Sequence, residues 1–181
     1  MQDRIKIFQE LVVQQFAYGG KKYAQSTEKE ATDCLFDTHG FRWLVGTIDK
    51  YTYRYKNLAR ERDLLKIATY MYILWLKRGF HLGASGSEEI INTTVPVKSA
   101  NFDKFVNLTT GYFGSTIEEP DYQQYVKRIH EMMCYWSEGE HKFQEITEEE
   151  IFAVYKACFM EWLMQFSDNA GQDTDTFNET K

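Results

Sequence analysis

The apolar side chains of residues 60–78 constrain the fold most strongly, because they recur at intervals of three and four residues. One helical face would carry a first set, and a second set would widen the apolar coverage around the helix. The first set is Leu64, Ile67, Ala68, Met71, Leu74 and Trp75, and the second is Leu65, Tyr72, Ile73 and Leu76. Gly79 stands where a helix commonly ends. The pattern therefore predicts a central helix that is buried on most sides.

Similar spacing predicts further helices, separated by glycines and by N-terminal capping patterns. The expected helices cover residues 2–17, about 27–37, 41–56, 101–110, 120–136 and 147–166. Their boundaries are indicated by Gly19-Gly20 and His39-Gly40, and by capping boxes of Thr27 with Glu30 and of Thr147 with Glu150. The alternation of residues 51–55 is strand-like, but it lies inside a helical pattern and is assigned to a helix.

These segments predict an all-α bundle of about six to eight helices, with residues 1–166 as one domain and 167–181 as a disordered polar tail. Only two of the 181 residues are proline, and 43% are hydrophobic, which permits long helices around an ordinary core. The polar stretch 82–100 is expected to be a connector rather than a functional loop. Gly46, inside a predicted helix, is expected to allow another group to approach the backbone closely.

The apolar stretches are all much shorter than the about 20 residues that span a bilayer, and residues 1–6 contain no apolar signal segment. We therefore expect a cytoplasmic protein with no membrane association. The three cysteines, Cys34, Cys134 and Cys158, show no metal-binding or disulfide spacing and are predicted to be half-buried small hydrophobic residues.

The charges are unevenly distributed along the chain. Residues 1–82 contain 14 Lys and Arg against 9 Asp and Glu, a net charge of +5, whereas residues 83–181 carry −11. The domain thus divides into a basic half, 1–82, and an acidic half, 83–166. The overall net charge of −6 disfavours nonspecific nucleic-acid binding by the whole surface.

Several common catalytic motifs are absent from the sequence. It contains no GxxxxGK[ST] phosphate loop, no GxGxxG and no HExxH. The glycines and serines of residues 83–87 lack a following lysine, so they are only a weak indication of phosphate binding. The four histidines are not paired at a ligand spacing, and nothing points to a Ser-His-Asp nucleophile arrangement.

Lys50 and Arg54 are four residues apart and therefore share one helical face. Their like charges repel unless a carboxylate or another anion lies between them. A phosphate would fit, since arginine binds it bidentately and lysine binds it as a point charge. The alternative is an interhelical network of salt bridges, in which Lys50 or Arg54 meets Asp63.

Glu30 and Asp33 are three residues apart, and paired carboxylates at this spacing can hold Mg²⁺ together with carboxylates from another helix. Asp63 and Glu61 are the candidates for that second contribution. The alternative is a solvated acidic face near a helix N-terminus.

Residues 46–56 and 61–70 resemble a family of small all-α bacteriophage domains that are described as nucleotide kinases and lack a phosphate loop. The family pattern is roughly G-[NT]-x-x-K-Y-x-x-R, a short gap, and [ED]-D-L-x-K-A-x-x-Y. The matching residues are Gly46, Lys50, Tyr51, Arg54, Asp63, Leu64, Lys66 and Tyr70. The second part is also similar to MazG-like nucleoside triphosphate pyrophosphohydrolases, but Ile67 precedes Ala68 and only Glu30 with Asp33 has the metal-ligand spacing of that family.

The resemblance implies a phage-type enzyme that acts on nucleotide phosphates by phosphoryl transfer or by removal of pyrophosphate. Lys50, Arg54 and Lys66 would bind phosphates, Tyr51, Tyr53 or Tyr70 would stack on a base, and Glu30, Asp33 and Asp63 would hold Mg²⁺. Arg54 and Asp63 would be the catalytic residues.

Two other functions stay open. The acidic half favours a non-catalytic phage protein that inhibits a basic host factor or sequesters a nucleotide. The 16% aromatic content favours a helical scaffold in which some aromatic residues face a partner subunit, and we expect a homo-oligomer in either case.

Overall fold

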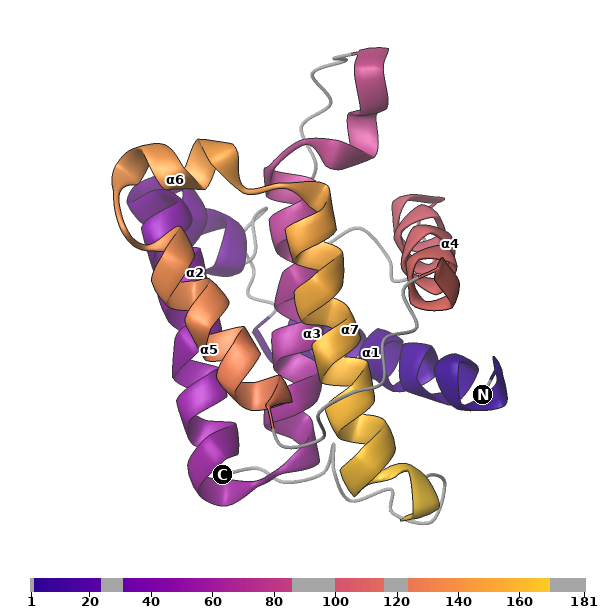
Figure 1. Ribbon diagram of the computed structural model, residues 1–181. Coiled ribbons are helices and arrows are strands. Elements are labelled where there is room, and N and C mark those ends of the chain that lie inside the picture. Colours follow the sequence, from indigo (N-terminus) through magenta and orange to yellow (C-terminus); the bar gives the residue numbers. More distant parts are fainter. Residues whose placement is uncertain (1, 24–30, 86–99, 116–123, 170–181) are drawn as a thin grey trace.

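The computed structural model describes residues 2–23, 31–85, 100–115 and 124–169. Within these ranges the chain is all-helical and contains no strand, which confirms the predicted fold class (Figure 1). The α-helices are α1 (Gln2–Tyr23), α2 (Ala31–Leu58), α3 (Glu61–Lys77), α4 (Ala100–Ser115), α5 (Tyr125–Trp136), α6 (Glu140–Glu145) and α7 (Glu148–Gln165). Two short 3₁₀ helices, η1 (Phe80–Ser85) and η2 (Ser167–Asn169), follow α3 and α7.

Helix α3 lies at the centre of the bundle and packs against α1, α2 and α7 (Figure 1). All of its residues from Arg62 to Leu76 are buried except Lys66 and Tyr70. It ends before Gly79, whose φ of 83° is a left-handed conformation that glycine adopts without strain. The prediction of a central helix over this segment is therefore confirmed. One hydrophobic core includes side chains from all seven α-helices.

The glycines of the first two helices agree only in part with the sequence prediction. Helix α1 continues through Gly19-Gly20 to Tyr23, so the predicted end at these glycines is wrong. A glycine inside a helix costs only about 1 kcal/mol, which packing elsewhere can offset. At Gly40, by contrast, φ is 69° and ψ is −159°, and this non-helical residue divides α2 as predicted. Added at Gly46, a Cβ would meet nothing within 4 Å, so none of the described residues makes the expected close approach.

The capping box that starts α7 is confirmed. The Thr147 Oγ1 atom accepts a hydrogen bond from the Glu150 backbone N–H at 3.1 Å, and the Glu150 carboxylate accepts one from the Thr147 backbone N–H at 2.9 Å. Helix α6 was not among the predicted helices. Some predicted features lie outside the described residues. These are the Thr27–Glu30 box, the start of the helix predicted over 120–136, and residues 170–181 of the predicted tail.

Three fully buried tryptophans each donate their indole N–H to a glutamate in the first turn of a helix. Trp75 in α3 donates to Glu148 of α7 at 2.9 Å, and Trp162 in α7 donates to Glu61 of α3 at 2.9 Å. Trp136 in α5 reaches Glu150 at a longer 3.4 Å. An acidic side chain is also favourable at a helix N-terminus, so each of these glutamates satisfies an indole N–H and stabilises its own helix.

Candidate functional site: a cation cluster between two helices

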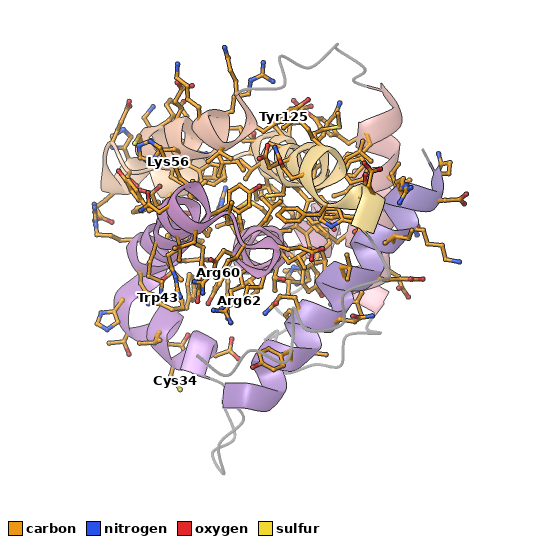
Figure 2. The ribbon with its side chains drawn as sticks, turned by 90° about the horizontal axis from the view of Figure 1, so that it is seen from below. Cys34, Trp43, Lys56, Arg60, Arg62 and Tyr125 are labelled. Atoms are coloured by element: carbon orange, nitrogen blue, oxygen red, sulfur yellow. The ribbon has the colours of Figure 1, made fainter. Side chains whose placement is uncertain are left out.

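A short link between α2 and α3 determines which residues of the two helices face each other. Only Ala59 and Arg60 separate the helices, and Ala59 has a positive φ of 49° while its N–H bonds to the Tyr55 carbonyl at 2.7 Å. The chain consequently reverses direction, and α2 and α3 run side by side (Figure 1). Figure 2 views this end of the pair from below, with Arg60 and Arg62 labelled near the start of α3.

This reversal brings together five residues that the sequence predicts to bind a nucleotide. The Lys50 and Lys66 Nζ atoms lie 4.7 Å and 4.9 Å from the centre of the Tyr51 ring, and the Arg54 Cζ atom lies 5.8 Å from it. The Tyr70 ring stacks on Tyr51, with centroids 5.8 Å apart and planes at 23°. Tyr51 itself is only 8% exposed. We call these five residues the cation cluster.

The cation cluster concentrates positive charge that the described protein does not fully neutralise. Lys50 and Arg54 make no ion pair with any described carboxylate. Asp63, the partner suggested by the salt-bridge alternative, instead accepts a hydrogen bond from the Arg60 Nε atom at 3.2 Å. The Tyr51 ring offers each cation an attraction of about 0.5–2 kcal/mol, but a ring cannot cancel a net charge. The arrangement is therefore suited to bind an anion.

The predicted Mg²⁺ ligands are placed differently. Asp33 is buried and pairs with the Lys77 Nζ atom at 2.7 Å, while Asp63 is fully buried beside Arg60. Glu61 accepts the Trp162 indole hydrogen bond. Within the described residues no group of three His, Cys, Asp or Glu side chains could hold a metal ion. Glu30 lies outside the described residues, so the three-carboxylate Mg²⁺ site stays a prediction that this donor set does not support.

Tyr53, the third tyrosine considered for base stacking, is separated from the cation cluster. It is 51% exposed, and its ring packs edge-on against His130 of α5, with centroids 5.2 Å apart. Tyr51 lies two residues earlier in the same turn, and a separation of about 200° around the helix axis places its ring on the opposite side of α2. Among the tyrosines, Tyr51 and Tyr70 therefore belong to the candidate site and Tyr53 does not.

A second set of polar side chains, which the sequence analysis did not predict, lies between α2 and α5. The His130 Nδ1 atom is 2.9 Å from the Asp49 Oδ1 atom, and the Cys134 Sγ atom is 3.6 Å from the His130 Nε2 atom. Cys34 and Cys134 are exposed, so the prediction that they are half-buried is wrong, while Cys158 is buried. The available signal was the four-residue spacing of His130 and Cys134 on a predicted helix.

A groove of about 530 Å³ between α1 and α4 contains none of the predicted site residues. Its lining combines apolar side chains such as Ile5 and Phe102 with polar ones such as Lys6 and Asp103. The cation cluster lies on other helices, so the predicted chemistry and this groove are separate features of the molecule.

Comparison with protein-family models, with curated proteins and with solved structures finds no match for this chain. The resemblance to phage nucleotide kinases consequently rests on the motifs in residues 46–70 alone. No helix within the described residues is long and apolar enough to cross a membrane.

Proposed function

We propose that this protein binds nucleotides and that the cation cluster holds their phosphate groups. The observation that carries the proposal is the convergence of Lys50, Arg54 and Lys66 on one tyrosine ring, from two helices, while Lys50 and Arg54 lack a described carboxylate partner. A di- or triphosphate would supply the missing negative charge.

Each residue would have a distinct role in phosphate binding. Arg54 is half-buried and would bind two phosphate oxygens through its planar guanidinium group. Lys50 is exposed and would act as a point charge at the outer edge, whereas Lys66 would bind from α3. The Tyr51 ring would hold the three cations in place through cation–π contacts, and it is already covered by them and by Tyr70. Stacking of a base would therefore involve Tyr70, which is only half-buried.

The geometry supports binding more directly than turnover. Asp63, the acidic residue to which the resemblance gives a catalytic role, is fully buried and hydrogen-bonded to Arg60. The described residues also provide no metal cluster. A phosphotransferase or pyrophosphohydrolase activity thus stays a prediction, as do a host-protein partner and a homo-oligomer. The six large hydrophobic side chains exposed in the described residues come from four different helices, which does not favour one apolar interface.

The proposal is tested by measuring thermal stabilisation of the protein by nucleoside mono-, di- and triphosphates at low salt, with and without Mg²⁺. Saturation at a hundredfold excess over the dissociation constant adds about 2.7 kcal/mol to the apparent stability. We expect stabilisation that increases with the number of phosphates. Arg54→Gln and Lys50→Gln should each weaken binding about ten- to a hundredfold, because a hydrogen bond to a charged group is worth about 1.5–3 kcal/mol.

Lys56→Gln is the matched control, because Lys56 is an exposed lysine of α2 that makes no contact with Tyr51. This variant should bind nucleotides as the wild-type protein does. Equal binding by all four proteins would show that nucleotides bind elsewhere. No stabilisation by any nucleotide would refute the proposal. Stabilisation that requires Mg²⁺ would instead restore the metal-dependent enzyme as the better interpretation.

A further inference from the structure

We propose that Cys134 is a reactive thiol that exchanges with low-molecular-weight disulfides, with His130 as its base and Asp49 as the residue that orients the histidine. The inference is independent of the nucleotide proposal, because it concerns the face of α2 that packs against α5. The three side chains form a spatial chain of contacts: the thiol lies within hydrogen-bonding distance of the histidine, and the histidine within that of the carboxylate. This arrangement of nucleophile, base and orienting residue activates cysteine in many enzymes.

The hydrogen bond to Asp49 determines which nitrogen of His130 carries a proton. A carboxylate can only accept, so the His130 Nδ1–H donates to the Asp49 Oδ1 atom at 2.9 Å. In the neutral imidazole the Nε2 atom then has a free lone pair, and this atom faces the Cys134 Sγ at 3.6 Å. The thiol proton therefore has an acceptor in place.

The surrounding structure fixes the histidine and leaves the sulfur accessible. Tyr53 packs edge-on against the His130 ring, and Asp49 and Tyr53 are one turn apart on α2. His130 and Cys134 are one turn apart on α5, and α2 packs directly against α5. Cys134 is exposed to solvent, whereas the side chains of His130 and Asp49 are 37% and 27% exposed. A small molecule in solvent can thus reach the sulfur without any movement of the helices.

The position of Cys134 within a helix favours a disulfide over an acyl group as its target. Attack on a carbonyl requires donors for the developing oxyanion, and backbone N–H groups at a helix N-terminus often supply them. Cys134 lies in the last turns of α5, where the backbone N–H groups are already bonded to carbonyls one turn earlier. Attack on a disulfide requires only access to one sulfur atom and a stable leaving thiol.

The exchange is balanced without a further reactant. The Cys134 thiol proton moves to the His130 Nε2 atom, and the thiolate attacks one sulfur of the disulfide. A protein–ligand S–S bond forms, the ligand S–S bond breaks, and the leaving sulfur takes the proton from His130. The products are a mixed disulfide at Cys134 and one free small thiol.

The experiment uses the folded 181-residue chain and 2,2′-dithiodipyridine, a neutral aromatic disulfide whose leaving thiol absorbs light. Cys34 is the internal control, since it is exposed and makes no side-chain hydrogen bond with the described residues. Cys34→Ser isolates the Cys134 rate, and Cys134→Ser isolates the Cys34 rate.

We expect Cys134 to react about tenfold faster than Cys34. In the Cys34→Ser background, His130→Gln should lower the rate to that of Cys34, and Asp49→Asn should lower it partly. The buried Cys158 reports on folding, because it reacts only when the protein opens, so a rate loss without Cys158 labelling is not caused by unfolding. Mass spectrometry after incubation with oxidised glutathione should locate the mixed disulfide at Cys134.

Equal rates at Cys34 and Cys134 would overturn the proposal. So would a Cys134 rate that is unchanged by both His130→Gln and Asp49→Asn. Transfer of an acyl group from a thioester to Cys134, together with slow disulfide exchange, would assign the site to acyl chemistry and would equally overturn it.

Discussion

Glu161 is a carboxylate placed among apolar side chains of α7, and its environment links stability to pH. Its side chain is 8% exposed and accepts a hydrogen bond from the Tyr55 hydroxyl at 2.9 Å. Burial raises the pKa of Glu161 above the ordinary 4.5, although the hydrogen bond from Tyr55 opposes this effect. Burial likewise raises the pKa of Tyr55 and of Cys158, and the nearby Glu161 charge adds to both shifts.

We predict that Glu161→Gln increases stability at neutral pH. A carboxyl group with a raised pKa in the folded state binds protons more tightly there than in the unfolded chain, so its contribution to stability is lost as the pH rises above 4.5. Glutamine keeps an oxygen that can accept from Tyr55 and carries no charge. The free energy of unfolding of Glu161→Gln and of the wild type is measured in urea from pH 4 to 8, at steps of about one pH unit. The variant should be the more stable protein, and the difference in free energy should grow as the pH rises.

Glu10→Gln, the same chemical change on the exposed face of α1, should leave the pH dependence unchanged. A Glu161→Gln protein that is less stable than the wild type at pH 8 would show that the ionised carboxylate is favourable where it lies.

Among the elements, α2 carries two glycines with opposite expected effects on stability. Gly40 has a φ of 69° and a ψ of −159°, a conformation that only glycine adopts readily, and Gly46 is helical and exposed. A Cβ would meet nothing within 4 Å at either position, so contacts do not distinguish them and the backbone alone does.

We predict that Gly40→Ala destabilises the protein by about 1–3 kcal/mol, because alanine is strained in this conformation. Gly46→Ala should stabilise it by about 0.5–1 kcal/mol, since alanine loses less conformational freedom in a helix. Chemical denaturation of both variants at one temperature gives the two signs directly. Stabilisation by Gly40→Ala would mean that α2 straightens at this residue, and destabilisation by Gly46→Ala would indicate a neighbour close to its backbone.

At the scale of the whole molecule, indole–glutamate hydrogen bonds join helix ends that are distant in sequence. Glu61 and Trp162 are 101 residues apart, and their bond connects the start of α3 to the end of α7. We predict that Glu61→Ala costs about 1–3 kcal/mol, because the fully buried Trp162 indole N–H loses its acceptor. Glu61→Gln keeps an acceptor oxygen and should recover most of this loss. Equal losses in the two variants, measured by urea denaturation, would instead assign the effect to the charge at the α3 N-terminus.

The sequence predicts features that depend on neighbours along one helix. The apolar spacing of 60–78 indicates the central helix, Thr147 with Glu150 indicates a helix start, and Lys50 with Arg54 indicates a shared charged face. Features that depend on how helices pair are not available from spacing. Asp49 and His130 are 81 residues apart, and no local pattern relates them.

The errors have the same physical origin. Local rules end a helix at Gly19-Gly20, yet α1 continues because packing and hydrogen bonding along the rest of the helix outweigh a local loss of about 1 kcal/mol per glycine. Composition predicts that a cysteine is partly buried, yet the exposure of Cys134 depends on which side of α5 faces α2. In both cases tertiary structure decides between outcomes that the sequence leaves close in free energy.

Adjacent residues of helix α2 face two different neighbouring helices. Asp49 and Tyr53 meet α5, while Lys50 and Arg54, each one position later, gather around Tyr51 beside α3. Successive helical residues are rotated by about 100° around the helix axis. The angle between the two groups of side chains is therefore fixed by the helix itself. Inserting or deleting one residue between Gly46 and Asp49 would displace both groups together. Evolution can therefore exchange individual side chains in this turn, but it cannot shift one group along the chain and keep the other in place.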